Sequence, residues 1–180
     1  MEINTGRQLG STVIQMREMV EILEANLQDV DAIASLFHNT IRRINFRDYT
    51  PVQIETWAGT APEPEKWRTR MKTKQTFIAS RAGELVGFVE LETDGHVDAL
   101  YVHHDHQGEG IASHLLKQIE KEAMRSGIIR LYTEASITAR HFFERRGFVI
   151  VKPQEVDYHG VKFKNYRMEK RISAEQSTKT

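Results

Sequence analysis

Two glycines, Gly108 and Gly110, lie in a short loop between a predicted strand at residues 96–102 and a predicted helix. The helix is predicted because apolar residues recur at helical spacing after the loop, namely Ile111, Leu115, Leu116, Ile119 and Ala123. Glycine has no Cβ, so backbone amides in this loop can approach a ligand closely. A helix N-terminus adds unpaired N–H donors and a partial positive charge. The loop therefore predicts a binding site for a phosphate or pyrophosphate.

Two side chains that can accept a proton, His96 and Asp98, lie on the strand that precedes this loop. Because side chains alternate along a strand, both share one face with Leu100 and Val102. Histidine titrates near neutral pH, and a carboxylate can take a proton or bind an amine, so both are candidates for acid–base chemistry. The alternative is structural: His96 then only ends a turn, and Asp98 is a solvated strand residue.

Residues 103–106 have the sequence His-His-Asp-His, which invites comparison with a metal site. Loop residues this close together do not readily converge on one ion, and no H-x-x-x-H helix pattern follows them. The chain has no cysteine, which excludes disulfides, thiolate metal sites and a cysteine nucleophile. We therefore predict no metal here, and a solvated loop beside the phosphate site.

The composition is that of a water-soluble globular chain. Its 180 residues are enough for one domain with a real core. Lys plus Arg equals Asp plus Glu at 25 each, so the charge predicts no nucleic-acid partner. No apolar run approaches the length of a membrane span, and no signal-peptide core is present. We expect a cytoplasmic protein without a membrane partner, either a monomer or a homodimer.

The scaffold around these residues is predicted to alternate between strands and helices. Strands are expected at residues 19–23, 76–80, 85–92, 96–102, 128–134, 148–152 and 161–168. Helices are expected to begin at Asp29, Thr50, Glu65, Gly110 and Thr138. Two of these predictions rest on specific signals. Thr50, Pro51 and Gln53 form a predicted capping box, and Gly127 fits a helix C-cap.

The loop also resembles a known one. Residues 107–112 fit the Q/R-x-x-G-x-G/A motif of the GCN5-related N-acetyltransferases, whose loop amides hold the pyrophosphate of acetyl-CoA. Residues 87–90 resemble the central hairpin of that family, and residues 139–148 resemble its late helix and Gly-Phe turn. The resemblance extends from about residue 17 to residue 170, and the YafP-like acetyltransferases are the most similar subgroup.

The resemblance implies an α/β fold. We expect a single mixed, mostly antiparallel sheet of six to seven strands, flanked by helices, with a splayed parallel pair. The domain is expected to span residues 16–172. Residues 1–15 are expected to be a disordered extension, and residues 173–180 a polar tail.

The resemblance also implies a function, namely acetyl transfer from acetyl-CoA to a primary amine of an unknown small molecule or peptide. In such a site His96 takes the position of a basic residue, with Asp98 two residues on. The cofactor would contact Leu100, Tyr101, Val102, Gln107, Gly108, Glu109, Gly110, Ile111, Ala112, Ser113, Ser136, Ala139 and Phe143. The alternative is a CoA-binding sensor or interaction module without robust transferase activity.

Two positions depart from the family pattern. Many relatives carry a tyrosine at the position of Phe143, where it protonates the CoA thiolate, and an asparagine at the position of Ser136. A phenylalanine has no proton to give, so the thiolate would take its proton from water or another group. Ser136 can still hydrogen-bond the pantetheine arm, and Phe143 can still pack against it.

Overall fold

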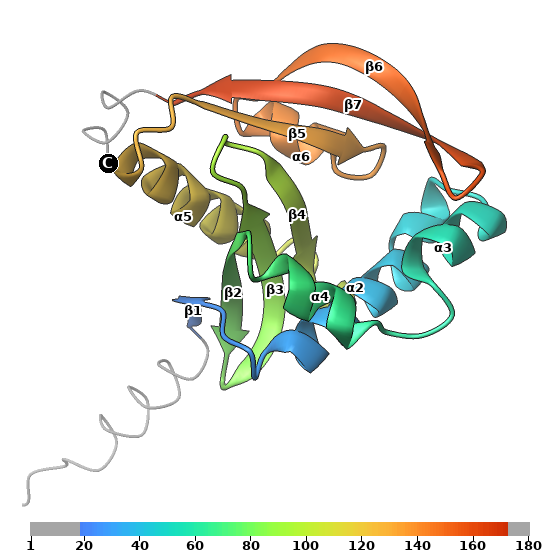
Figure 1. Cartoon of the computed structure of the whole chain (residues 1–180), viewed down its shortest axis with the longest axis horizontal. Helices are drawn as coiled ribbons and strands as arrows, with labels where there is room; N and C mark the ends of the chain where they lie inside the picture. The colour runs from blue at the N-terminus through green and yellow to red at the C-terminus, as the bar shows by residue number, and fades with distance from the viewer. Residues whose placement is uncertain (1–18, 173–180) are drawn as a thin grey trace, which may run out of the picture.

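The structure, a computed structural model, describes residues 19–172, which form two sheets with helices on both sides (Figure 1). The expected extension at residues 1–15 and the tail at residues 173–180 lie outside the described residues. No helix within residues 19–172 is long and apolar enough to cross a bilayer.

The described residues form seven strands. The antiparallel four-stranded sheet has the order β1 (Val20–Glu24), β2 (Gln75–Arg81), β3 (Glu84–Leu91) and β4 (Val97–Val102). The antiparallel three-stranded sheet has the order β5 (Arg130–Ser136), β7 (Val161–Arg171) and β6 (Val149–Tyr158). This mixed α/β architecture and its strand number are as predicted.

The two sheets meet at a single parallel bridge between His96 and Tyr132, where the Tyr132 amide also donates to the Gly95 carbonyl at 3.0 Å. Beyond this bridge β4 pairs only with β3, and β5 pairs only with β7. The expected splayed parallel pair is therefore present. The splay begins so early that hydrogen bonding divides the expected single sheet into two.

Gly95 permits the junction. A Cβ on this residue would lie 2.1 Å from the Arg130 carbonyl oxygen, and its φ is +94°. Both the close backbone approach and the left-handed conformation require glycine.

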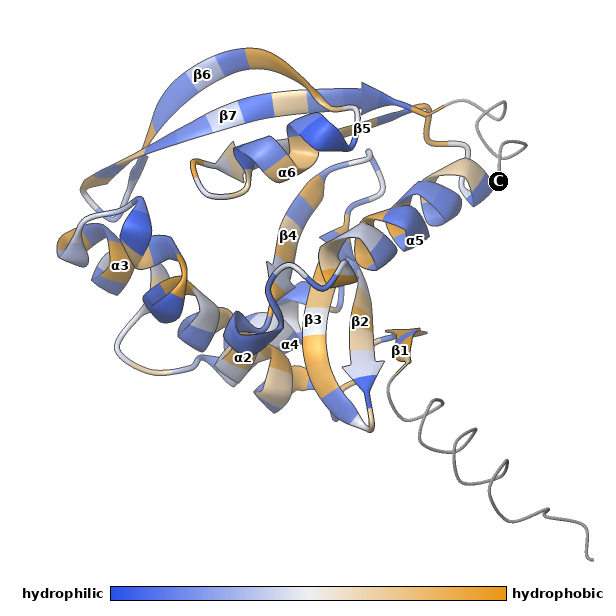
Figure 2. Cartoon of the chain, turned by 180° about the vertical axis from the view of Figure 1, so that it is seen from behind, coloured by the Kyte–Doolittle hydropathy of each residue, from blue (hydrophilic) through white to orange (hydrophobic). Residues whose placement is uncertain are grey.

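Helices cover the two sides of the sheets and bury two apolar cores. On one side, β3 and β4 pack against α2 (Val30–Arg43), and Trp67 of α4 (Pro64–Arg70) meets Phe88 of β3. The helix α3 (Pro51–Ala58) packs on α2 and β7. On the other side β3 and β4 pack against α5 (Ile111–Arg125), and α6 (Arg140–Arg145) packs against β5 and β6. Short 3-10 turns follow α2 at Asn45–Arg47 and β4 at His104–His106. Figure 2 shows hydrophobic bands along β3, which faces both cores.

Local signals placed several element ends correctly. Thr50 and Gln53 form the predicted reciprocal capping box of α3, and Gly127 has φ +71° after the last turn of α5. The predicted strand at residues 128–134 is shifted to Arg130–Ser136. The last two strands are longer than predicted, because β6 continues to pair with β7 as far as Tyr158, and residues 169–171 of β7 pair with β5.

Replacing Ile119 with alanine should destabilise the fold by about 2–5 kcal/mol, because this α5 side chain is completely buried. Ile129→Ala is the matched control, since Ile129 is 76% exposed and its loss should change stability by less than about 0.5 kcal/mol. Urea unfolding measures both. Equal effects of the two variants would contradict the assignment of α5 to the core.

Candidate functional site

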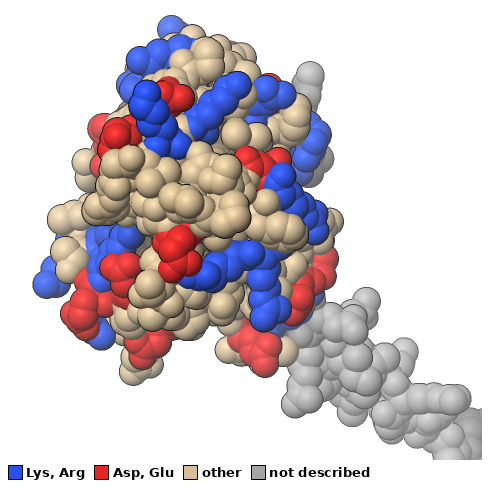
Figure 3. Space-filling view, turned by 90° about the vertical axis from the view of Figure 1, so that its right-hand side faces the viewer, with Lys and Arg blue, Asp and Glu red and all other residues tan. Residues whose placement is uncertain are grey.

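A pocket of about 840 Å³ lies where the two sheets diverge. Its walls include the facing edges of β4 and β5, the loop before α5, and residues of α2, α3, α4 and α6. Because β4 and β5 have no strand partner on these facing edges, their backbone groups are available to a ligand that carries amides. Figure 3 shows the side of the molecule with α3, where uncharged atoms form a band between charged groups above and below.

One end of this pocket lies at the N-terminus of α5. Gly108 and Gly110 have φ values of +80° and +83°, and a Cβ on either would point into open space. Within the described chain, no acceptor pairs with the backbone amides of Gly108, Gly110 and Ala112. Gln107 fixes the loop, because its Nε2 donates to the carbonyls of Val102 at 2.7 Å and His103 at 3.2 Å. Unpaired donors and the dipole of a 15-residue helix together favour a bound phosphate.

Residues at the start of α6 form the opposite wall of this end. The Ser136 Oγ accepts a hydrogen bond from the Ala139 amide at 3.1 Å and so helps to begin the helix. Phe143 is buried and packs edge-on against Phe148, with ring centroids 5.0 Å apart. Arg146 donates to the Ser113 Oγ, which links α6 to the first turn of α5. These contacts place cationic and apolar groups on two sides of the same slot.

Asp98 lies in the pocket wall but is already paired with two cations. Its carboxylate accepts from Arg70 at 2.6 Å and also from Lys74. Burial alone would raise the pKa of Asp98, but the hydrogen bond from Lys74 and the charge of Arg70 outweigh it and lower the pKa. A carboxylate that holds its charge so firmly is a weak proton acceptor.

His96 lies behind the pocket wall, at the junction of the sheets. It does not line the pocket, and its ring stacks on Tyr132 with centroids 4.7 Å apart. Its Nε2 is 2.6 Å from Glu134 Oε2, and its Nδ1 is 3.3 Å from Glu92 Oε1. Glu134 does line the pocket. His96 therefore reaches the pocket through Glu134.

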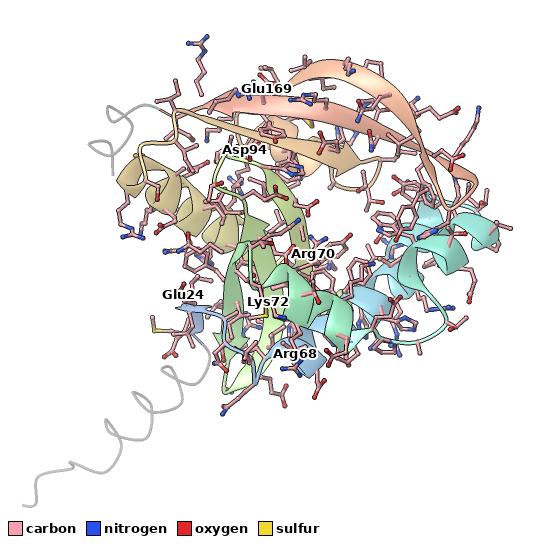
Figure 4. The ribbon with its side chains drawn as sticks, viewed as in Figure 1. Glu24, Arg68, Arg70, Lys72, Asp94 and Glu169 are labelled. Atoms are coloured by element: carbon pink, nitrogen blue, oxygen red, sulfur yellow. The ribbon has the colours of Figure 1, made fainter. Side chains whose placement is uncertain are left out.

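Glu90 is a fully buried carboxylate beneath this network. Arg70 donates to both of its oxygens, including a bond of 2.9 Å from Nε to Oε2. Burial raises the pKa of Glu90, although the hydrogen bonds and charge of Arg70 act in the opposite direction. Figure 4 shows Arg70 directed toward the middle of the molecule, whereas Arg68 and Lys72 lie lower on the outside. Arg70 thus ties Glu90 and Asp98 together.

Most of the sequence-predicted site residues are brought together by the fold. The pocket wall contains Asp98, Leu100, Tyr101, Val102, Gln107, Gly108, Gly110, Ile111, Ala112, Ser113, Ser136, Ala139 and Phe143. His96 is outside it, and so is Glu109, whose side chain pairs with Arg81 at 2.5 Å.

Two polar residues around this site could not be identified from the sequence. Arg70 and Lys74 come from α4 and the turn after it, where no periodic pattern distinguished them from solvated cations. From the sequence, Tyr49 is one of several aromatic residues that could line an acceptor pocket. Its hydroxyl accepts from the Ile137 amide at 2.9 Å and donates to the Lys164 carbonyl at 3.3 Å, and burial raises its pKa.

The structure corrects the expectation that side chains of the histidine-rich loop, residues 103–106, do not converge. Ligand atoms of His103, His104 and Asp105 do converge, since they lie within 4.8 Å of one another. The guanidinium of Arg43, however, donates to His104 Nε2 at 2.9 Å and puts a positive charge on the cluster. The Glu92, His96 and Asp98 group meets the same distance criterion, and there Lys74 supplies the positive charge.

Arg70→Met should destabilise the protein by about 3–5 kcal/mol at neutral pH, because it leaves the Glu90 carboxylate buried without its cation. Without Arg70 the folded-state pKa of Glu90 rises further above the unfolded value. Stability linked to a raised pKa is complete below the unfolded pKa and is lost as pH rises through the folded one. The deficit of the variant should therefore be smaller at about pH 5 than at about pH 7.5.

Urea unfolding of both proteins at the two pH values measures this deficit. Arg68→Met is the control, because among residues 19–172 Arg68 pairs only with the exposed Glu65, and its loss should cost less than about 1 kcal/mol. A deficit that does not depend on pH would show that Glu90 is not the group left unpaired.

Comparisons with known proteins agree with this architecture. Residues 45–170 match the family model of the GNAT acetyltransferase domain. The uncharacterized N-acetyltransferase YafP of Escherichia coli (strain K12) is 31% identical over 140 residues, which cover 78% of this chain and 88% of YafP.

Two solved structures extend the comparison. A GCN5-related N-acetyltransferase from Rhodopseudomonas palustris, also described as an aminotransferase of class II, has a TM-score of 0.82 at 31% identity, covering 86% of this chain and 97% of that one. The PaiA N-acetyltransferase of Thermoplasma acidophilum, solved with coenzyme A, has a TM-score of 0.71 at 19% identity, and the match covers 85% of this chain and 99% of that one. The family model and the 31% identity to YafP show that this chain belongs to the GCN5-related N-acetyltransferase family of acyltransferases.

Proposed function

We propose that this protein transfers an acetyl group from acetyl-CoA to a primary amine of a small molecule or peptide. The observation that carries the proposal is the slot between β4 and β5, which runs into the unpaired amides at the N-terminus of α5. A pantetheine arm carries amides that suit the strand edges, and a diphosphate suits the helix N-terminus. The coenzyme A in the PaiA structure supports this choice of ligand.

The proposed cofactor contacts divide into three groups. Leu100, Tyr101 and Val102 offer strand backbone to the pantetheine arm, and residues 107–113 surround the diphosphate. Ser136, Ala139 and Phe143 form the wall at the reactive end. Glu109 contributes backbone only, because its carboxylate pairs with Arg81.

Acetyl transfer needs a neutral amine, since an ammonium group has no lone pair. We assign the first proton acceptance to Glu134, whose carboxylate lines the pocket, with His96 behind it at 2.6 Å. The amine nitrogen then bonds to the thioester carbon and gives its second proton to water, the carbon–sulfur bond breaks, and the electron pair leaves with the CoA thiolate. His96 passes the proton toward Glu92 and solvent, and the thiolate takes a proton from water. Asp98 binds the acceptor side through its fixed negative charge.

Gly110→Val should weaken acetyl-CoA binding by at least tenfold, or about 1.4 kcal/mol, because the new side chain enters the space assigned to the diphosphate. Gly83→Val is the matched control. Gly83 has nearly the same φ, +84°, and equally open space, but lies in the β2–β3 turn, so it reproduces the backbone strain alone. Calorimetry measures both affinities. Equal affinities of the two folded variants would remove the loop from the site.

Glu134→Gln should lower turnover by about 100-fold or more while the affinity for acetyl-CoA stays nearly unchanged, because it removes a proton acceptor of the same size. His96→Ala should also lower turnover, and the rising limb of the pH–rate profile should shift or disappear in both variants. Asp98→Asn should lower turnover mainly because it weakens the binding of the acceptor amine.

Glu120→Gln is the control, because Glu120 lies on α5 outside the pocket and pairs with Lys170 at 2.6 Å. Steady-state rates of thiol release across pH measure the series. Wild-type turnover and an unshifted profile in the Glu134 and His96 variants would mean that the amine arrives already neutral.

A further inference from the structure

The pocket wall on the side of α2, α3 and α4 is built from aromatic rings. They come from α2, the turn before α3, α3, α4, β4 and β7, and are Phe37, Tyr49, Trp57, Trp67, Tyr101 and Phe163. Phe37 and Trp67 meet edge-on at 5.0 Å, as do Tyr49 and Trp57 at 5.3 Å, so the rings hold one another in place. Such a wall offers a large apolar surface of fixed shape. It suits an acceptor with an aromatic or bulky apolar body.

The carboxylates of the pocket are already in use. Among the lining residues only Asp98 and Glu134 are acidic. Both are assigned to the reacting amine, and Asp98 is in addition paired with Arg70 and Lys74. A second ammonium group on the acceptor would therefore meet no free carboxylate. Polyamines and other polycations fit this charge pattern poorly.

Lys66 is a cation that lacks a carboxylate partner within the described part of the chain. It comes from α4 and lines the pocket, with its Nζ 5.5 Å from the centroid of the Phe37 ring. Arg145 and Arg146 lie at the end of α6, beside the loop assigned to the diphosphate. Lys164 is exposed on β7, with its Nζ 5.7 Å from the centroid of the Tyr166 ring, whereas the partly buried Lys66 lies on the aromatic wall. An unpaired ammonium group next to apolar rings attracts an anionic group more strongly than one in open water.

The end of the β6–β7 hairpin closes this side of the pocket. Gln53 of α3 donates to the Lys162 carbonyl at 2.7 Å, and Trp57 meets Phe163 with ring centroids 6.0 Å apart. The hairpin end and α3 lie against each other in Figure 1. A polypeptide crossing the site would have to break these contacts, whereas a small molecule would not.

We propose that the acceptor is a small primary amine with an aromatic or bulky apolar body and a single anionic group, which Lys66 binds. The proposal rests on the N-acetyltransferase function proposed above and names the substrate class of the same site. Large apolar α-amino acids are members of this class.

Matched pairs that differ only in a carboxylate test the proposal. Thiol release from acetyl-CoA is measured with L-phenylalanine against phenethylamine, L-tryptophan against tryptamine, and L-leucine against isoamylamine, with spermidine and a lysine-containing peptide beside them. We expect kcat/KM to be about tenfold or more higher for at least one acid than for its decarboxylated partner. Spermidine and the peptide should be slower than that acid.

Lys66→Met keeps most of the aliphatic length and removes the charge. It should lower kcat/KM for the preferred acid about tenfold and leave kcat/KM for the decarboxylated partner of that acid unchanged. Lys72→Met is the matched control, because Lys72 is exposed just after α4 and does not line the pocket. The Lys72→Met variant should change kcat/KM for neither substrate.

Several outcomes would overturn this inference alone. They are a preference for spermidine, the peptide or the decarboxylated amines, or a Lys66→Met variant that affects both members of a pair equally. Binding of acetyl-CoA without thiol release for any amine would instead overturn the proposed transferase function, and this inference with it.

Discussion

The site depends on one close backbone approach. At residue 95 the β3–β4 turn comes so near to Arg130 that only a glycine fits, and the two sheets are joined there by one parallel bridge. Because both strands continue away from this point with partners only on their outer sides, their inner edges open into a slot. A longer parallel ladder would have satisfied these edges and left no room for a ligand. The pocket is thus a consequence of how short the junction is.

The charged side chains around the junction stabilise this geometry and also determine which carboxylates stay ionised. Arg70 and Lys74 hold Asp98 in its ionised form, while His96 links Glu134 to Glu92 across the gap between the sheets. Tyr132, on which His96 stacks, donates to Asp94 at 2.5 Å, and this bond raises its pKa to about 12. Figure 4 shows Asp94 near Glu169, at the meeting of the two sheets. The same contacts that join the sheets therefore set which carboxylate is free to accept a proton.

The sequence predicted those features of the fold and the site that depend on residues close together in the chain. The loop before α5, the capping box at Thr50 and the C-cap at Gly127 each depend on residue types within a few positions. The pairing of His96 with Glu134 spans 38 residues, and that of Arg70 with Asp98 spans 28. No periodicity encodes such pairs, because they arise only when α4 and β5 are brought to β4. For the same reason the sequence offered His96 and Asp98 as candidates for acid–base chemistry and did not distinguish Glu134.

The two ends of the pocket are chemically different, and each suits a different part of the proposed reactants. Backbone donors at Gly108 and Gly110 and the guanidinium groups of Arg145 and Arg146 concentrate positive potential at one end, which suits the diphosphate of acetyl-CoA. The other end is apolar and closed by the β6–β7 hairpin, so it favours the neutral amine once its proton has passed to Glu134. The sulfur would lie at the far end of the pantetheine arm from the diphosphate. Because a thiol loses its proton close to neutral pH, a thiolate is a stable leaving group there. A dedicated acid at the position of Phe143 therefore adds little, and the thiolate can take its proton from water.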